Sequence, residues 1–407
     1  MRRALFVSLA LWWAGKARAS PCSEQLPAWL TSKEAFVRAD EPAELQGLHI
    51  LCLWQDADNL TDGLHMEAYS GGVSQTSRHV LASSASWSQF RAELVHKLRI
   101  RRATNEWGYL QLKQAFGLFD QYGARLASAE AAKEAGLVFL FEGGQWLWPP
   151  VQVGHVRKLP GSGMALETLS VQPLVFRVRG FLQPEECDEI IELGRPNMHE
   201  SPVTLMDKDK GKAAKEFRTS TQARAAHTMS PILSRLDQRV ANLTRVPELH
   251  NEQVQILRYR GGEYYAAHLD NWDPAFYSGS DTAFMQHGHH NRMATVFWYL
   301  TSAEKGGETL FPRAHGLPQP QDMWGCHKGL KVRPEKGTVV LWYSLRANGN
   351  TDPNGLHAGC PVEGNVEKWS ANFWVWNKPL RKAHIGLPDE GVDEYDKHGN
   401  FIDKHEL

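Results

Sequence analysis

Residues 253–270 read QVQILRYRGGEYYAAHLD, and this stretch indicates how the chain folds more clearly than any other. Polar and apolar side chains largely alternate from Gln253 to Tyr259, which is the period of a strand with one buried face. The stretch ends in His268-Leu269-Asp270. Because residues i and i+2 of an extended segment point to the same side, the imidazole and the carboxylate are predicted to face one space.

The C-terminal half continues this strand pattern after two helices. Apolar residues recur at helical spacing from Pro184 to Leu193, with Gly194 at the end, and again from about Ser230 to Leu243. Short runs with a period of two follow, separated by turn residues. The sequence therefore predicts an α+β protein in which helices support a double-stranded β-helix, or jelly roll. The candidate strands are 253–259, 292–300, 307–311, 338–344, 355–362 and 368–376.

The first part of the chain has a mixed character. Ser128 can cap a short helix, and other short strand and helix patterns alternate around it. This alternation predicts a smaller α/β N-terminal domain of unknown role at 20–150. The next segment, 151–173, is rich in Gly, Pro and Val and is predicted to be a linker. The catalytic domain is expected at 174–379, and a tail at 380–407. The patterned segments of the first part are 49–54, 87–102, 129–135 and 137–141.

A third candidate ligand lies far from the first two. His357 follows Asp270 by 87 residues, within another predicted strand. Two imidazoles and one carboxylate can hold Fe(II) on one side, which leaves positions open for a bidentate 2-oxoacid and for oxygen. His-x-Asp alone occurs by accident in many soluble proteins. The interpretation of His268, Asp270 and His357 as an iron site therefore depends on what accompanies them.

Lys368 is the main accompanying residue, since it begins a predicted strand eleven residues after His357. An inward ammonium on such a strand needs an anion, and the distal carboxylate of 2-oxoglutarate is one candidate. The alternative is a surface ion pair at the exposed start of the strand. Alternation places five residues on one face of this strand, namely Lys368, Ser370, Asn372, Trp374 and Trp376.

Ordered motifs run from about Phe181 to Trp376. They are Gln255-Ile256-Leu257-Arg258-Tyr259, Tyr264-Tyr265-x-x-His268-x-Asp270, Arg292-x-Ala294-Thr295-x-x-x-Tyr299-Leu300, Gly306-Gly307-Glu308-Thr309-x-Phe311-Pro312, Pro334-x-Lys336-Gly337, Leu356-His357-Ala358-Gly359-Cys360-Pro361-Val362 and Gly364-x-x-x-Lys368-Trp369. Together these motifs resemble the catalytic domain of the prolyl 4-hydroxylase family. The resemblance implies iron ligation by His268, Asp270 and His357, and pairing of Lys368 with the C5 carboxylate of 2-oxoglutarate.

The same resemblance suggests roles for four more residues. Tyr259 and Tyr299 are expected to border the cosubstrate, and Trp374 to pack beside the metal; the alternative is that these aromatic residues only fill the core. Glu216-Phe217-Arg218-Thr219-Ser220 resembles a family segment near the peptide groove. Arg218 is therefore a candidate for contacting substrate carbonyls, with a surface salt bridge as the alternative.

The resemblance also implies an activity. The enzyme is expected to hydroxylate peptidyl proline to 4-hydroxyproline, in the manner of a procollagen-proline hydroxylase, with O₂ and 2-oxoglutarate giving succinate and CO₂. L-ascorbate is expected to rescue uncoupled turnovers, and the substrate is expected to be a proline-rich or collagen-like peptide. The alternatives are a lysyl or other peptidyl hydroxylase and a non-catalytic lumenal binding protein. Lysyl hydroxylases of this superfamily usually carry Arg where this chain has Lys368, which favours the prolyl branch.

Both ends of the chain carry targeting patterns. Met1-Arg2-Arg3, an apolar stretch and Ala17-Arg18-Ala19 predict a signal peptide at 1–19, with an uncleaved anchor as the alternative. The apolar run is shorter than the roughly 20 residues that span a bilayer. Lys404-His405-Glu406-Leu407 resembles a retrieval signal. Together these patterns predict an endoplasmic-reticulum lumenal protein, without a stable membrane span after cleavage, that does not need a disulfide isomerase partner for retention.

Charge, cysteines and three local motifs complete the predictions. With 46 Asp and Glu against 45 Lys and Arg, no field would draw the chain to nucleic acid. Of five cysteines, Cys326 and Cys360 are the first candidates for a disulfide, because both lie in the proposed catalytic domain. Glycosylation sequons begin at Asn59 and Asn242. The histidine cluster at 287–290 is predicted to be an exposed lid loop, with a second metal site as the alternative.

Overall fold

The computed structural model describes residues 46–55, 63–70, 75–82, 86–100, 116–150, 152–273, 276–277, 291–380, 394–395 and 401–402. Four predictions concern segments outside these ranges, and they stay predictions. They are the signal peptide, the sequon at Asn59, the histidine cluster and the retrieval signal. Within the described residues no helix is both long and apolar enough to cross a membrane.

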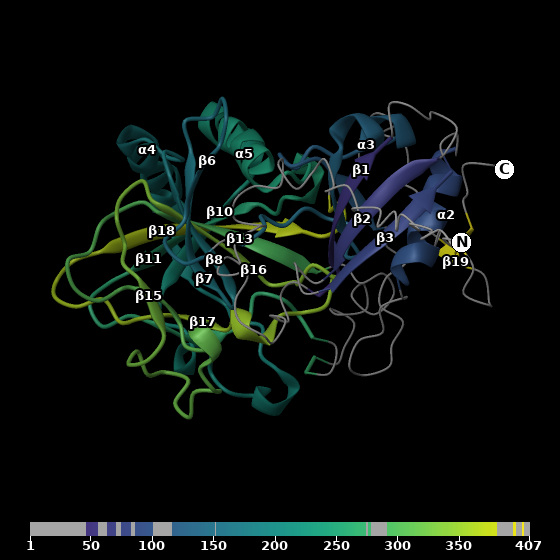
Figure 1. Ribbon diagram of the computed structural model, residues 1–407. Coiled ribbons are helices and arrows are strands. Elements are labelled where there is room, and N and C mark those ends of the chain that lie inside the picture. The colour runs from purple at the N-terminus through teal and green to yellow at the C-terminus, as the bar shows by residue number, and fades with distance from the viewer. Residues whose placement is uncertain are drawn as a thin grey trace, which may run out of the picture.

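A large antiparallel sheet forms the framework of the C-terminal part (Figure 1). Its nine strands lie in the order β6-β7-β8-β16-β13-β18-β11-β10-β9, so strands far apart in sequence become neighbours. The strands are β6 (Val156–Lys158), β7 (Ala165–Val171), β8 (Leu174–Arg179), β9 (His199–Glu200), β10 (Thr221–Ala225), β11 (Val254–Tyr259), β13 (Arg292–Tyr299), β16 (Val339–Tyr343) and β18 (Lys368–Trp376).

A smaller antiparallel sheet faces the large one. Its order is β12 (Tyr265–His268), β17 (His357–Gly359), β14 (Thr309–Phe311) and β15 (Leu330–Val332). Tyr259 and Trp342 of the large sheet share a buried cluster with Phe311 and Val332 of the small one. Figure 1 shows the layers, with α4 and α5 above the large sheet and β17 below it. The predicted jelly roll with supporting helices is confirmed.

The two helices cover the outer face of the large sheet because each has one apolar stripe. α4 spans Pro184–Gly194 and α5 spans Pro231–Thr244. Ser230 caps α5, since its side chain accepts a hydrogen bond from the backbone N–H of Leu233 at 3.3 Å. Val254 and Ile256 of β11 pack with the helices, while the alternate residues face the small sheet. The buried stripe of α5 includes Ile232, Leu233, Leu236, Val240 and Leu243.

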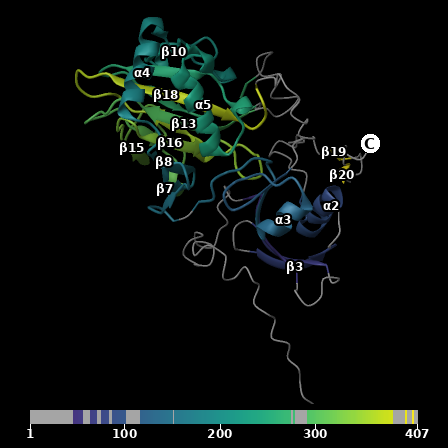
Figure 2. The same cartoon turned by 90° about the horizontal axis from the view of Figure 1, so that it is seen from above.

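The N-terminal part contains a five-stranded sheet in the order β3-β2-β1-β5-β4, seen in purple and blue in Figure 1. Its strands are β1 (Leu48–Trp54), β2 (Leu64–Ser70), β3 (Gln75–Leu81), β4 (Gly117–Phe119) and β5 (Leu137–Phe141), with helices α2 (Trp87–Leu98) and α3 (Ala129–Ala135). Every pairing in this sheet is antiparallel. The predicted mixture of helices and strands is thus present as an antiparallel sheet accompanied by α2 and α3 (Figure 2).

The N-terminal sheet shares a hydrophobic core with the catalytic part. Trp146 is fully buried, with its ring centroid 5.4 to 5.7 Å from those of four aromatic side chains. Next to it, the Trp148 indole N–H donates to the carbonyl of Leu243 on α5 at 2.7 Å. The N–H of Gly143 donates to the carbonyl of Ala347 at 2.8 Å. The first part of the chain is thus docked on the second through the segment 143–148.

The linker prediction for 151–173 is wrong. β6 and β7 lie in this segment, and β7 pairs with β8, so both strands belong to the large sheet. The glycines that suggest a linker instead form turns between these strands. Gly161 and Gly163 have φ angles of +72° and +71°, a region that favours glycine. Short strands joined by such turns contain too few apolar residues to stand out from a linker in the sequence.

A disulfide joins the segment before β15 to the residue that follows β17. Cys326 and Cys360 are bonded, with an S–S distance of 2.08 Å, so this predicted pair is confirmed. Cys187 is buried and has a free thiol. Asn242 is exposed on α5, while the Thr244 of the same sequon is buried in the core. Glycosylation at this position stays a prediction.

Candidate active site

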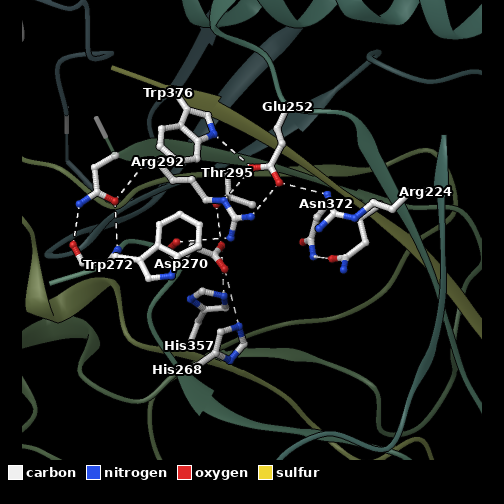
Figure 3. Close-up of polar contacts among 12 residues, drawn as sticks. Arg224, Glu252, His268, Asp270, Trp272, Arg292, Thr295, His357, Asn372 and Trp376 are labelled. Carbon is white, nitrogen blue, oxygen red and sulfur yellow. Dashed lines mark hydrogen bonds and ion pairs between the residues drawn. The ribbon is translucent and has the colours of Figure 1, made fainter. Parts of the chain in front are cut away.

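Three side chains that lie far apart in sequence meet at the edge of the small sheet (Figure 3). His268 ends β12 and His357 begins β17, and the two residues are partners across the antiparallel ladder. Asp270 follows two residues after β12. Its carboxylate oxygens lie 3.7 Å from Nε2 of His268 and 3.5 Å from Nε2 of His357. The three potential ligand atoms all lie within 4.8 Å of one another.

Each imidazole is oriented from its far side. Nδ1 of His268 and Nδ1 of His357 each lie 2.9 Å from the backbone carbonyl oxygen two residues earlier in the chain. With Nδ1 donating, Nε2 carries the lone pair and faces Asp270, an arrangement common for metal-binding histidines. Tyr265 stacks on His268 with ring centroids 3.6 Å apart, and Trp342 lies 4.6 Å from His357. Packing therefore fixes both rings.

The large sheet holds Asp270 in place. The Thr295 hydroxyl donates to Oδ2 of Asp270 at 2.7 Å, and Nη1 of Arg292 donates to its backbone carbonyl at 3.5 Å. Burial by itself would raise the pKa of Asp270. The neighbouring His357, His268 and Arg292 side chains and the Thr295 hydrogen bond outweigh burial and lower that pKa to about 2. The carboxylate is therefore ionised at any physiological pH.

The electrostatics suit a divalent cation. Burial, together with the neighbouring His357, lowers the pKa of His268 to about 3, so its imidazole is neutral near neutral pH. The cluster then offers two imidazole nitrogens and one carboxylate. This donor set, supplied from one side, fits the two-histidine, one-carboxylate pattern of non-haem Fe(II) oxygenases.

Lys368 lies in an aromatic cage between the two sheets. It begins β18 and is only 1% exposed, which excludes the alternative of a surface ion pair. Nζ lies 5.1, 5.5 and 5.6 Å from the ring centroids of Tyr259, Phe297 and Tyr299. Burial lowers its pKa to about 7, and among the described residues only Glu308 opposes that shift. A buried ammonium of this kind fits a small dicarboxylate ligand.

The predicted aromatic residues lie at two places around this interior. Tyr259 and Tyr299 line the cage, and the Tyr299 hydroxyl donates to the Thr309 hydroxyl at 2.7 Å, linking the two sheets. Trp374 lies further along β18, where it is the cross-strand partner of Thr295. The guanidinium of Arg292 lies 3.5 Å from the centroid of the Trp374 ring. The structure thus brings Trp374 to the group that holds Asp270.

Arg218 is separated from the His268 imidazole by the ring of Tyr265. Its guanidinium is 4.5 Å from the centroid of Tyr265, the ring that stacks on His268. Arg218 is 5% exposed, so it is not the surface residue of the alternative interpretation. Nε donates to the Ser220 hydroxyl at 2.9 Å, while Nη2 is buried and has no partner among the described residues. A buried N–H group without a hydrogen-bond partner is available to donate to an acceptor on a ligand.

Two further residues support the site, and the sequence alone does not indicate their roles. Thr295, within the motif Arg292-x-Ala294-Thr295, holds the Asp270 carboxylate. Glu252 accepts two hydrogen bonds from Arg292 at 2.9 Å, one from Arg224 at 3.0 Å and one from the Trp376 indole at 3.1 Å (Figure 3). Burial raises the pKa of Glu252, but Arg292, Arg224 and the Trp376 hydrogen bond together outweigh burial and lower that pKa. The only sequence signal for Glu252 is its position directly before the strand pattern that begins at Gln253.

Comparison with known proteins agrees with this geometry. A family model described as the 2OG-Fe(II) oxygenase superfamily matches residues 254–376. Probable prolyl 4-hydroxylase 7 from Arabidopsis thaliana is 39% identical over 233 residues, which are 55% of this chain and 70% of the relative. Prolyl 4-hydroxylase 1 from the same plant is 32% identical over 276 residues, 66% of this chain and 90% of the relative.

Among solved structures, the viral collagen prolyl hydroxylase from Paramecium Bursaria Chlorella virus-1 in complex with 2OG is similar to part of the chain. It is 25% identical, and the match covers 50% of this chain and 95% of the viral chain, with a TM-score of 0.35. The fold and the site together define a non-haem Fe(II), 2-oxoglutarate-dependent oxygenase. Within that class, the chain belongs to the prolyl 4-hydroxylase family.

Proposed function

We propose that this enzyme hydroxylates C4 of prolyl residues in proline-rich or collagen-like chains within the endoplasmic-reticulum lumen. The observation that carries this proposal is the pairing of a His-Asp-His cluster with a caged, buried Lys368 between the same two sheets. The plant relatives named as prolyl 4-hydroxylases support the choice of proline.

The roles of the residues follow from their surroundings. His268, Asp270 and His357 would hold Fe(II). The Lys368 ammonium would pair with the C5 carboxylate of 2-oxoglutarate, with Tyr259 and Tyr299 beside it. With both bound, the site would supply oxidative decarboxylation of the 2-oxoacid by O₂ and insertion of one oxygen atom into the substrate C–H bond. L-ascorbate serves as the reductant for turnovers that do not reach substrate.

The remaining residues position the peptide and keep water away. Trp374 and Tyr265 are apolar walls beside the metal ligands. Arg218 donates from its unpaired Nη2 to a backbone carbonyl of the substrate. Because proline lacks an N–H, the carbonyls of a proline-rich chain are its main polar backbone groups. A buried cationic donor beside an aromatic wall suits such a chain.

The test is succinate formation from 2-oxoglutarate with Fe(II) and ascorbate, with and without poly-proline and collagen-like peptides. We expect these peptides to stimulate turnover and to gain one oxygen atom on proline by mass spectrometry. Arg218→Ala should raise the peptide KM about 10- to 100-fold, the cost of one charged hydrogen bond of about 1.5–3 kcal/mol. Its peptide-independent turnover should not change.

Arg235→Ala is the matched control, because Arg235 is an exposed arginine on α5, across the large sheet from the site. It should behave like the parent enzyme. Oxygen gained on lysine and not on proline would overturn the proposed substrate in favour of a lysyl hydroxylase. Iron-bound protein without turnover on any peptide would favour the non-catalytic binding protein.

Retention in the lumen is proposed to rest on Lys404 to Leu407 and not on a disulfide isomerase partner. Deleting these four residues should send the protein out of the endoplasmic reticulum, as followed by secretion into the medium or by localisation of a tagged chain. If the shortened protein stays in the lumen, another element or a partner retains it.

A further inference from the structure

The chain carries a Pro-x-Pro sequence of its own, Leu317-Pro318-Gln319-Pro320-Gln321. No other two of its 21 prolines are separated by a single residue. The segment lies between a 3₁₀ helix (Ala314–Gly316) and β15, outside any helix or strand. Pro318 is exposed and Pro320 is half-buried. The enzyme therefore displays, on its own surface, the kind of sequence that it is proposed to modify.

The backbone of this segment is held extended by its prolines. Leu317 has φ −64° and ψ 144°, the polyproline II conformation. Each proline fixes its own φ and disfavours a helical conformation in the residue before it, which here covers residues 317 to 320. Among the described residues, no hydrogen bond reaches the backbone of residues 318–321. The segment thus has the extended backbone of a polyproline II ligand, with its carbonyl groups free of internal hydrogen bonds. Because it is already extended, it loses little conformational entropy when another molecule binds it.

Contacts of the residues that follow the segment hold it on the outside of the molecule. The carbonyl of Met323 accepts a hydrogen bond from the N–H of Ala267 on β12 at 2.7 Å. Cys326 packs with Ala358 and Cys360 on the face of the small sheet opposite to His357. The segment therefore cannot turn into the active site of its own chain while these contacts persist.

Side-chain contacts define how the two prolines are presented. The Arg313 guanidinium donates to Oε1 of Gln319, and Nε2 of Gln319 lies 3.2 Å from the sulfur of Met323. These contacts tie the exposed Gln319 side chain to its neighbours and so fix the residue between the two prolines. Pro318 is exposed on the surface, while Pro320 is half-buried.

We infer that Pro318 and Pro320 are hydroxylated by the active site of a second copy of this chain. In each event the proline C4–H becomes C4–OH, and 2-oxoglutarate is oxidised to succinate and CO₂. One oxygen atom of O₂ goes to the proline and the other to succinate. No further oxidant is needed. This inference rests on the proposed function, because its acceptor is a peptidyl proline.

The experiment uses two populations of the full chain in one reaction. The acceptor is ¹⁵N-labelled His268→Ala protein, which lacks a proposed iron ligand and cannot modify itself. It is mixed with unlabelled active enzyme, Fe(II), 2-oxoglutarate, ascorbate and a proline-rich peptide. Proteolysis and mass spectrometry then examine the labelled fragment that contains residues 317–321. Labelled Lys368→Ala, which keeps all three iron ligands, is the second acceptor in case the first folds poorly.

We expect the labelled fragment to gain one oxygen atom on Pro318, on Pro320 or on both, and only when active enzyme is present. Pro160, which is exposed but lies in a tight turn, should stay unmodified. Pro318→Ala combined with Pro320→Ala should remove the modification and leave turnover on the added peptide unchanged. An unmodified fragment in a reaction that hydroxylates the peptide overturns this inference alone. If the peptide is not hydroxylated either, the proposed function fails and the inference fails with it.

Discussion

His357→Ala is expected to lower succinate formation at least about 1,000-fold and to abolish stoichiometric Fe(II) binding, because a facial site with two remaining ligands no longer fixes the metal. His357 lies across the β12–β17 ladder from His268, and its Nε2 is 3.5 Å from Asp270. Its removal therefore also takes away a neighbour that helps to keep the pKa of Asp270 low. Bound iron after anaerobic loading, measured beside turnover, would check both parts of this expectation.

Two matched variants distinguish the loss of a metal ligand from a general loss of folded structure. His155→Ala removes a half-buried histidine directly before β6, the edge strand of the large sheet, and it should retain the iron content and turnover of the parent. Thr295→Val keeps all three ligands but removes the 2.7 Å hydrogen bond to Asp270. Loss of such a supporting contact typically weakens metal binding about 10- to 100-fold. Full turnover by the His357→Ala protein would show that the metal binds elsewhere.

The parts of the fold that could be predicted from the sequence are those that depend on short-range pattern. β11, β13 and β18 are long runs that alternate or stay apolar, and the structure has them within a residue or two of the predicted bounds. α4 and α5 carry clear start and stop residues. His268 and Asp270 share a motif, so their common direction follows from the pleat of a strand. Local chemistry suffices for all of these features.

The parts that could not be predicted depend on which strands become neighbours. Thr295 reaches Asp270 only because β13 lies between β16 and β18 in the large sheet. Glu252 becomes the acceptor for Arg292, Arg224 and Trp376 through the same strand order. The sequence around these residues contains no pattern that predicts such contacts. The linker error has a related cause, since β7 is stabilised by β8 and the large sheet rather than by its own composition.

Lys368→Ala is expected to weaken 2-oxoglutarate binding about 100- to 1,000-fold, because the dicarboxylate would enter an apolar cage without its cationic partner. The side chain is 1% exposed and lies among Tyr259, Phe297 and Tyr299, so solvent cannot take its place. Metal affinity should change little, since Lys368 is not one of the clustered ligands. Calorimetric titration of 2-oxoglutarate into protein loaded with a redox-inert divalent metal would measure the affinity directly.

The pH dependence of the same titration tests the charge of Lys368 in particular. Burial lowers the pKa of Lys368 to about 7 in the free protein, and a bound carboxylate must raise it. Binding therefore favours the protonated amine: affinity should be highest below pH 7 and fall as pH rises above it, by up to about tenfold per pH unit, until the pKa of the bound state is reached. Lys368→Arg, which stays protonated throughout, should bind more weakly but with little change between pH 6 and 8.5. Equal pH profiles for the parent and the arginine variant would mean that Lys368 is already fully charged in the free protein, and that burial does not lower its pKa into this range.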